Sequence, residues 1–531
     1  MSIKPLTEPR SNATRKAYPS RRRFWLKILV AVLLGGIFAV AIASWYAGQI
    51  VRRHMVAALE THYHSKVELK SFDVLIFPRI IIRGEDLVLR KDATPSAPPF
   101  IKISKFTADA GILDLLRTKK RIRRVTLEGL EIHIVHSAPA EPNSEQSQGQ
   151  KRKVPEFVIS EVSADDTRLV IHPQDPGKDP RVWDIHQLSL RSAGTADSMH
   201  YKATLTNPTP PGKIDSTGYF GPFNVEDPGK SPLKGDYQFR NADLGHFKGI
   251  GGTLSSDGAF SGVLDRIDVK GKCDVADFSV RDGHKVHLTT DFVAVVDGTD
   301  GDTYLHEVRA AFLNTRLLAR GKVEGSEGQK GKTISLKVDS EQARVEDLVT
   351  LVVPNEPLLT GAAELHTSFE LPPGKTDVLD RLRLDGAFGL EQTKFSNNSI
   401  QQKIATLSAR SQGDKSENIV PGDTASNFKG HFTLANGVAR FSNLTFDVPG
   451  ASVNLAGTYD LDKGALDFQG HLHMQAKLSE MTSGVKSFLA KIAQPFFNGK
   501  KGEGQTDIPI KISGSRKEPK FGIDVGKVLK P

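Results

Sequence analysis

Short runs in which apolar residues occupy every second position recur along the chain from Val67 to its end. A spacing of two is the period of a β-strand with one apolar face and one polar face. The runs follow one another at intervals of roughly 10–15 residues, as strands joined by short connections do. The pattern predicts a mainly β fold, an extended antiparallel sheet or groove with a few covering helices. Examples are Leu444/Phe446/Val448, Val453/Leu455 and Ile508/Ile510/Ile512.

Glycine marks the boundaries that we expect between strands. The alternation of Val125 and Leu127 changes phase at Gly129 and continues from Leu130, which indicates a bulge or turn. The phrases LKGDYQF, SDGAFSGV, LDGAFGL and FKGHFTL repeat the order of turn, glycine and strand, so we expect one long sheet built from hairpins. The pairs expected to form turns are Gly235-Asp236, Asp257-Gly258, Asp385-Gly386, Asn436-Gly437 and Lys463-Gly464.

Three segments have helical periodicity. Ser340 to Val353 carries apolar residues on one face and precedes Pro354, and Ile400 to Leu407 is shorter. The segment 478–494 has the strongest apolar stripe, a capping Ser479 and a terminating Pro495. We expect this amphipathic helix to cover one end of the sheet. The alternative is a helix at a membrane or partner interface, with lysines on its polar side.

The longest apolar run, Ile28 to Ala47, carries no charge and spans ~30 Å as a helix, the thickness of a bilayer core. Eight Lys/Arg residues and one Glu precede it, so the positive-inside rule places residues 1–27 in the cytoplasm. A cleaved signal peptide is the alternative, because Ala39-Val40-Ala41 and Ala41-Ile42-Ala43 resemble cleavage sites. The run exceeds the usual ~7–15-residue signal core, which favours a retained transmembrane anchor.

The net charge of +9 is concentrated in this basic tail. The rest of the chain is close to neutral, so it lacks the electrostatic basis for nucleic-acid binding. Cys273 is the only cysteine, which excludes an internal disulfide and any zinc site that needs more than one cysteine. A protein with a single thiol suits an oxidising compartment such as the periplasm.

Two segments imitate catalytic motifs without matching them. Five residues separate Gly325 from Gly331, where a phosphate-binding loop has four, and the following TISLKVD predicts a strand instead of a helix. Ser483 and Lys486 have the S-x-x-K spacing, but no S-D-N partner exists. We therefore expect no catalytic site, no cofactor and no enzymatic activity.

Two residue groups have the donor types of a metal site. Asp297, Asp300 and Asp302 offer carboxylates to Ca²⁺, but they lack the full ligand series and are expected to form an acidic β-turn. His471 and His473 share one face of a strand, a spacing repeated by His62 and His64. No third ligand of suitable spacing is near them in the sequence, so we expect no metal at either pair.

Three regions together resemble the AsmA family of bacterial envelope proteins. The first is the basic tail, apolar helix and VELKSFDVLIFPRIIIRGEDLVLR (67–90). The second is FSNNSIQQKIATLSAR (395–410) followed by FKGHFTLANGVARFSNLTFDVPGASVNLAGTYDLDKGALDFQG (428–470). The third is IPIKISGSRKEPKFGIDV (508–525). The middle of the chain is similar only in its general alternation of short strands and turns. The resemblance implies a single-pass protein of a Gram-negative inner membrane with a periplasmic β-rich body.

The resemblance also implies a role in supplying phospholipid to the outer membrane, in the manner of groove-forming, bridge-like lipid carriers. A sheltered groove removes the cost of exposing acyl chains to water, ~0.8 kcal/mol per methylene. The alternative is a non-catalytic scaffold or chaperone-like factor for outer-membrane protein assembly, which would contact an envelope protein partner along sheet edges. Candidate lipid-lining positions are Phe432, Leu434, Leu444, Phe446, Val448, Val453 and Leu455, which would otherwise fill a closed core.

These observations divide the chain into six parts. They are a basic cytoplasmic tail (1–27), a transmembrane helix (28–50), an AsmA-like N-terminal β region (51–136), a flexible linker (137–156), a middle β-repeat region (157–390) and an AsmA-like C-terminal β region (391–531) that contains the amphipathic helix.

Overall fold

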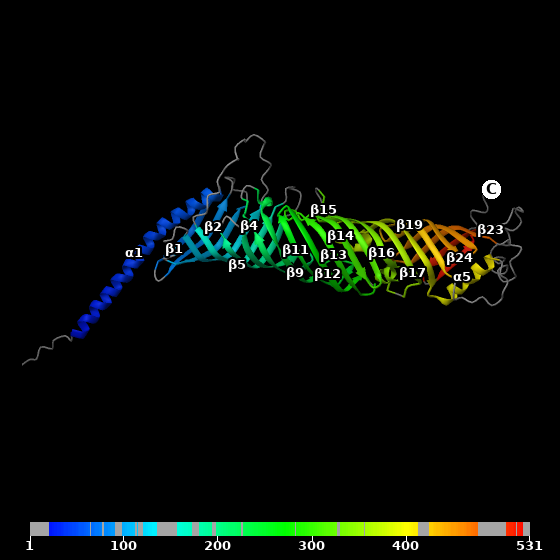
Figure 1. Cartoon of the computed structure of the whole chain (residues 1–531), viewed down its shortest axis with the longest axis horizontal. Helices are drawn as coiled ribbons and strands as arrows, with labels where there is room; N and C mark the ends of the chain where they lie inside the picture. Colours follow the sequence, from blue (N-terminus) through cyan, green and yellow to red (C-terminus); the bar gives the residue numbers. More distant parts are fainter. Residues whose placement is uncertain are drawn as a thin grey trace, which may run out of the picture.

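The computed structural model shows one long curled sheet with a helix projecting from its N-terminal end (Figure 1). The expected linker, the helix 478–494 and most of the basic tail lie outside the described residues. The structure describes residues 21–63, 65–76, 79–90, 98–111, 114, 120–134, 157–172, 180–193, 198–224, 227–281, 283–326, 330–354, 356–412, 424–475, 506–516 and 518–523.

The sheet contains 24 strands, and the prediction of a mainly β fold is confirmed. The helices are α1 (Arg21–Tyr63), α3 (Val345–Val352), α4 (Val378–Arg381) and α5 (Asn398–Ser411), with short 3₁₀ turns at Pro228–Lys230 and Leu244–His246. The first twelve strands are β1 (Lys66–Leu75), β2 (Ile80–Arg90), β3 (Ile101–Ala110), β4 (Lys120–Ile134), β5 (Phe157–Ile171), β6 (Arg181–Ala193), β7 (Met199–Pro208), β8 (Pro211–Phe220), β9 (Pro232–Asp243), β10 (Ile250–Gly251), β11 (Thr253–Val263) and β12 (Arg266–Val280). The others are β13 (Val286–Val296), β14 (Thr303–Phe312), β15 (Thr315–Gly325), β16 (Lys332–Arg344), β17 (Leu359–Leu371), β18 (Arg383–Phe395), β19 (Ser426–Ala435), β20 (Val438–Val448), β21 (Ala451–Asp460), β22 (Ala465–Met474), β23 (Thr506–Ser515) and β24 (Pro519–Ile523).

Helix α1 is continuous and contains one segment, Leu34–Thr61, that is long and apolar enough to cross a membrane. Its large apolar side chains between Leu34 and Ile50 are exposed, whereas Met55, Leu59 and Tyr63 pack against apolar residues of β1–β4. The helix therefore has two parts, a free apolar rod and an end that is docked on the sheet.

Most neighbouring strands follow one another in sequence and pair antiparallel, as in hairpins, with a single parallel pair among the described ladders. The exceptions in order surround the two-residue strand β10, where β9 pairs with β11 and β10 with β12. The parallel pair is β4 and β5, which run in the same direction with Lys120 opposite Phe157. A parallel pair needs a connection that carries the chain back along the strands, and the expected linker lies between these two strands. The uniform hairpin pattern predicted from the sequence is therefore wrong at this point.

Three of the five predicted glycine turns are wrong. Gly235, Gly258 and Gly386 lie within β9, β11 and β18, while Asn436-Gly437 and Lys463-Gly464 do connect strands. The three strand glycines face aromatic rings or a close neighbouring backbone, so glycine is used there for space and not for turn geometry.

The phase change at Gly129 is confirmed as a kink inside β4. Gly129 has φ 62°, and Asp86 and Asp166 have φ 51° at matching positions of β2 and β5. These left-handed residues form a line across the sheet, and each switches the side chains that follow it to the other face.

The short helix at Ile400 to Leu407 is confirmed as α5, but the predicted helix 340–353 is only partly correct. Residues Ser340–Arg344 continue β16, and α3 begins at Val345. Pairing of Ala343 and Arg344 with β17 accounts for the difference, because the strand ladder extends into the expected helix.

Candidate functional site: the concave face of the sheet

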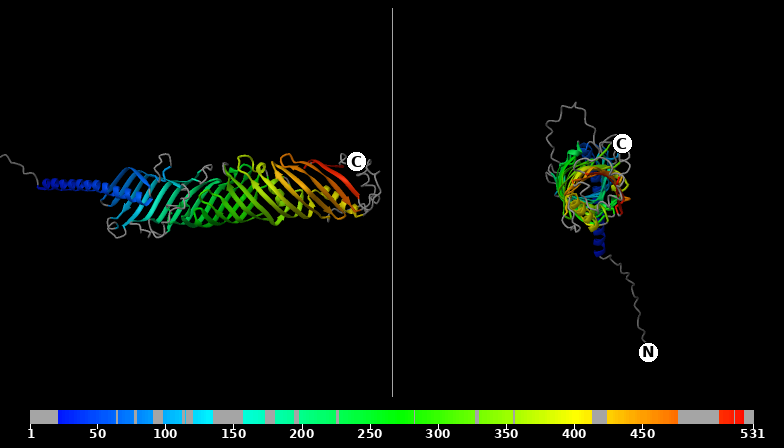
Figure 2. Two further views of the ribbon diagram at one scale, coloured as in Figure 1. Left: turned by 90° about the horizontal axis from the view of Figure 1, so that it is seen from above. Right: turned by 90° about the vertical axis from the view of Figure 1, so that its right-hand side faces the viewer.

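The two faces of the sheet have opposite chemistry, which β17 shows clearly. Leu365, Phe369 and Leu371 are half-buried or buried on the concave face, whereas Glu364 and Glu370 are exposed on the convex face. Seen end-on, the strands form a ring around the long axis (Figure 2). The alternation read from the sequence therefore lines the inside of a curled β groove with apolar side chains.

The convex face is covered by ion pairs between neighbouring strands. Their charged groups are largely exposed, so each pair contributes little stability, on the order of 0–1 kcal/mol. Together they keep the outer surface polar. Examples are Arg124–Glu161 at 2.9 Å, Arg168–Asp184 at 3.2 Å, Lys272–Asp291 at 3.0 Å and Arg383–Glu370 at 3.0 Å.

Glycines on the concave face make room for aromatic rings. A Cβ atom on Gly258 would lie 2.6 Å from the ring of Tyr237, and one on Gly271 would lie 2.8 Å from Phe292. The Tyr237 hydroxyl forms a 3.1 Å hydrogen bond with Ser256, and burial raises the pKa of Tyr237. The tyrosine therefore stays neutral at ordinary pH, and the middle of the groove is lined by uncharged groups.

All seven candidate positions lie on the concave face, but they divide into two groups. Four are buried: Leu434, Phe446, Val448 and Val453. Three are half-buried: Phe432, Leu444 and Leu455.

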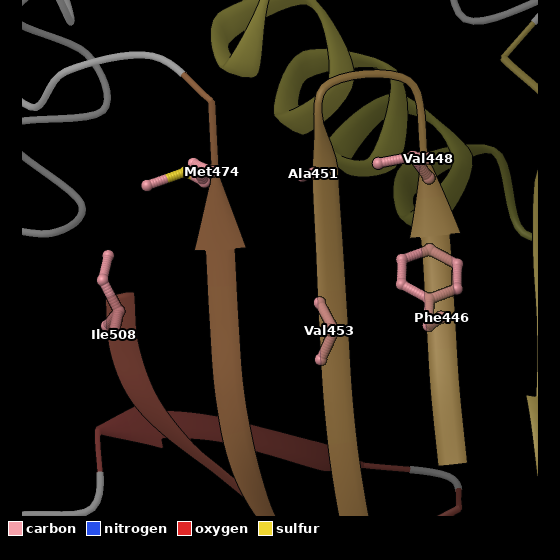
Figure 3. Packing of buried hydrophobic residues seen from close by; sticks show 6 residues of the cluster. All are labelled: Phe446, Val448, Ala451, Val453, Met474 and Ile508. Carbon is pink, nitrogen blue, oxygen red and sulfur yellow. The ribbon is translucent and has the colours of Figure 1, made fainter. Parts of the chain in front are cut away.

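Helix α5 covers three of the four buried positions, Phe446, Val448 and Val453, at the C-terminal end of the groove. Ile404 and Leu407 of the helix pack on a cluster that contains Phe446, Val453 and Met474 (Figure 3). Leu434 lies apart from this cluster, in a second apolar cluster with Leu371 and residues near α4. These four side chains therefore act as core residues in this structure.

Polar contacts hold α5 in place. Asn397 caps its first turn by accepting a 2.9 Å hydrogen bond from the Ser399 N–H, and Ser408 donates to the Pro449 carbonyl at 2.9 Å. Gln401 accepts from the Phe395 N–H at 2.9 Å and donates to the Thr424 carbonyl at the same distance. The helix is thus tied to the ends of β18, β19 and β20.

A row of aromatic side chains lies beside the covered cluster, in which Phe388, Phe432 and Phe441 are half-buried and Phe468 is buried. Phe388 is 6.0 Å from Phe432 and 6.1 Å from Phe441, and Phe441 is 5.8 Å from Phe468 between ring centroids. Leu444 and Leu455 are register partners next to this row. The half-buried members of this row, together with Leu444 and Leu455, form the stretch of the concave face that remains accessible.

The two long edges of the curled sheet touch each other. We call the edge where β12 ends and β13 begins rim A, and the edge where β13 ends and β14 begins rim B. Arg281 at rim A pairs with Asp377 at 2.8 Å and with Asp380 and Asp462, all at rim B. Burial alone would lower the pKa of Arg281, but its hydrogen bonds to Asp377 and Asp462 outweigh burial and raise it.

Apolar and backbone contacts extend this seam. Ile250 and Val280 at rim A pack against Val378 and Leu382 at rim B, and the Val378 N–H donates to the Lys248 carbonyl at 2.9 Å. The sheet therefore closes on itself here, with α4 lying across the join.

The rims also meet at two places nearer the N-terminus. Arg181 at rim A faces the loop of Asp297, Asp300 and Asp302 at rim B. Burial lowers the pKa of Arg181, and this effect outweighs the three carboxylates, which raise it. Phe100 before β3 lies 6.3 Å from Phe223 beyond β8. The groove is thus bridged at intervals along its length.

The carboxylates of the predicted acidic turn have hydrogen-bond partners within the fold, whereas Ser483 and Lys486 lie outside the described residues. Asp297 accepts from Thr299, and Asp302 accepts from the Gly325 N–H at 3.0 Å and from Lys332. Among the described residues, no group of three or more His, Cys, Asp or Glu side chains is arranged to hold a metal ion. The Gly325–Lys332 segment joins β15 to β16, as expected for a strand connection.

His471 and His473 do share the convex face of β22, and both rings approach Asp507 of β23, at 3.1 and 3.6 Å. Sequence reasoning also missed the main aromatic lining residues, Phe388, Phe441 and Phe468. The available signal for Phe388 was the glycine two residues before it, Gly386, because residues two apart share a strand face, and the predicted Phe432 follows Gly430 in the same way. Phe441 and Phe468 lack this signal.

No family model, no curated protein and no solved structure matches this chain.

Proposed function

We propose that this chain is an AsmA-like, membrane-anchored protein that shelters phospholipid acyl chains on the concave face of its sheet and helps supply or maintain the outer membrane. The observation that carries the proposal is the accessible apolar row around Phe432, Phe441 and Leu444 on a sheet whose other face is charged. An apolar surface of this kind, kept open in a protein with a polar exterior, is typical of a binding surface.

The energetics favour lipid as the occupant. About 30 exposed methylenes of a phospholipid cost on the order of 25 kcal/mol in water, and an apolar groove removes most of that cost. The 24 strands form a ribbon about 110 Å long at ~4.8 Å per strand. The bridged rims keep a chain inside the groove, and the proposed role is non-catalytic.

The membrane location follows from α1 and its basic flank. The exposed apolar part of α1, from Leu34 to Ile50 within the candidate span Leu34–Thr61, anchors the sheet in the inner membrane, and the charge bias before it directs the sheet to the periplasm. The family resemblance of the two ends of the chain supports the same arrangement.

Photo-crosslinking in cells tests the proposal. A photoreactive amino acid at Phe441 or Leu444 should yield lipid adducts by mass spectrometry, whereas one at Arg440, on the convex face of the same strand, should not. Absence of lipid adducts at both concave positions, in a protein that remains folded and abundant, would overturn the proposal.

The runner-up, a scaffold for outer-membrane protein assembly, rests on the last strand. Among the described ladders, β24 pairs only with β23, and its other edge offers backbone groups to a partner strand. Crosslinks from β24 to an envelope protein, together with no lipid on the concave face, would favour this function.

A further inference from the structure

A pocket lies where the anchor helix meets the first strand of the sheet. Its volume is about 420 Å³, and it is lined by Gln49, Arg52, Arg53, Val56, Ala57, Glu60, Val67 and Leu69. The lining residues belong to α1 and β1. These two elements adjoin at the N-terminal end of the sheet (Figure 1). The position of the pocket is therefore the point where the membrane anchor and the groove adjoin.

The pocket combines a cationic wall with an apolar wall. Arg52 donates from Nη2 to the Leu69 carbonyl at 2.8 Å, which fixes its guanidinium and leaves further N–H groups free to donate. Arg53 is exposed beside it. Glu60 is the pocket's acidic residue, and its Oε1 lies 3.4 Å from the Val67 N–H. Two arginines against one glutamate leave the lining with a net positive charge.

The apolar wall is continuous with the concave face. Val67 and Leu69 of the pocket pack against the cluster of Leu87, Leu89 and Ile103 that lines the first strands. A molecule with an anionic head at the arginines could therefore place an apolar chain directly on the groove lining.

The arginines lie at the depth of lipid headgroups. Trp45 and Tyr46 are exposed on α1, as residues of an aromatic belt are, and Arg52 lies seven residues further on, ~10 Å along the helix. The headgroup layer extends ~5–8 Å beyond the hydrocarbon core on each side of a bilayer, and the long side chains of the arginines can extend back over the remaining distance.

We propose that this pocket binds the phosphate group of a phospholipid at the membrane surface and passes its acyl chains onto the groove lining at Val67 and Leu69. The inference rests on the proposed lipid-sheltering function and names where the lipid leaves the membrane. Arginine suits this task because its planar, always-charged guanidinium donates two parallel hydrogen bonds to a phosphate.

The test uses the full chain in phosphatidylcholine nanodiscs that contain a photoactivatable lipid. One arm contains phosphatidylglycerol and the other contains diacylglycerol with the same chains. Mass spectrometry quantifies labelling of the pocket segment 49–69. We expect phosphatidylglycerol to label this segment about 10-fold more than diacylglycerol, equivalent to about 1.4 kcal/mol. The double variant Arg52→Gln/Arg53→Gln should remove the preference.

Lys66→Gln/Lys70→Gln is the matched control, because it removes the same number of positive charges from β1 outside the pocket lining, where Lys70 pairs with Asp86. It should keep the preference. Equal labelling by both lipids in the wild type, or an unchanged preference in the double variant, would overturn the inference. Displacement of bound radiolabelled phosphate from the wild type, without preferential labelling by phosphatidylglycerol, would assign the site to free phosphate and would also overturn it.

Labelling of residues 432–455 in detergent-solubilised protein separates this inference from the proposed function. The wild type and the double variant should both be labelled there when lipid is supplied directly. Missing label in both would contradict lipid sheltering itself. If both proteins are labelled at 432–455 but the pocket segment shows no preference for phosphatidylglycerol, only the proposed headgroup site would be contradicted.

Discussion

The two halves of strands β20 and β21 carry the same apolar alternation but differ in their surroundings. Phe446 and Val453 are 8% and 7% exposed beneath α5, whereas Leu444 and Leu455, one step along the same face, are half-buried. The difference comes from the helix that covers one half and not from the strands. Alternation therefore identifies the concave face, and tertiary cover decides which of its residues form a core and which form a binding surface.

The largest expected effect separates these halves directly. Phe446→Asp buries an unpaired carboxylate among Phe428, Val453 and Met474, and should destabilise the end of the groove by about 4 kcal/mol. Phe441→Asp leaves its carboxylate accessible to water and should cost about 1 kcal/mol. Hydrogen exchange of β20–β23 in the full chain measures both. Equal protection in the two variants would show that the halves do not differ.

The seam between the rims should open when its central cation is removed. Arg281→Gln leaves Asp377, which is 17% exposed, without its charged partner and should cost about 2 kcal/mol. Faster hydrogen exchange is expected at 246–252 and 372–382. Arg383→Gln removes an exposed ion pair on the convex face. It should change the free energy of local opening measured by hydrogen exchange there by less than about 0.5 kcal/mol. A seam that stays protected without Arg281 would mean that the apolar contacts alone hold it.

Replacing a glycine that packs against an aromatic ring by a larger residue should lower the stability of the fold. Gly258→Ala places a Cβ 2.6 Å from the Tyr237 ring and should lower stability by about 1–2 kcal/mol. Gly389→Ala is the matched control, because its nearest neighbour, Glu364, lies 3.9 Å from the new Cβ. Thermal unfolding of the full chain compares the two, and equal melting temperatures would refute the role of ring packing.

A small pH effect is expected at α3. Partial burial raises the pKa of Glu346, but hydrogen bonds from the Gly361 N–H at 2.9 Å and from Arg344 at 2.7 Å outweigh it and hold the pKa below its ordinary value. A pKa lowered by folding means that Glu346 stabilises the fold above its unfolded pKa and loses this effect as pH falls through the folded pKa. Glu346→Gln should therefore flatten the loss of α3 hydrogen-exchange protection below about pH 4.5. An identical acid profile in the variant would contradict this role.

The sequence supported the fold class, the apolar concave face and α5, because local periodicity determines all three. The sequence wrongly predicted turns at Gly235, Gly258 and Gly386. Glycine in a sequence looks the same whether it forms a turn or lies inside a strand and leaves space for a neighbouring ring or backbone. The parallel β4–β5 pair and the contact of Arg281 with Asp377 could not be derived, because each depends on the path of the chain and on the curl of the whole sheet. The sequence also could not show which of the seven candidate lining residues are buried and which are half-buried, because that depends on where α5 packs on the sheet.

The central claim is that lipid chains occupy the concave face, and the single native cysteine tests it directly. Cys273 lies half-buried on that face, opposite Ser256 and Thr290, while Lys272 beside it is exposed on the convex face. A nitroxide on Cys273, measured by electron paramagnetic resonance in protein purified from membranes, should be more accessible to oxygen than to a water-soluble nickel complex. The Cys273→Ser/Lys272→Cys variant should show the reverse. If the nitroxide at Cys273 in lipid-containing protein were more accessible to the nickel complex than to oxygen, the account would be contradicted.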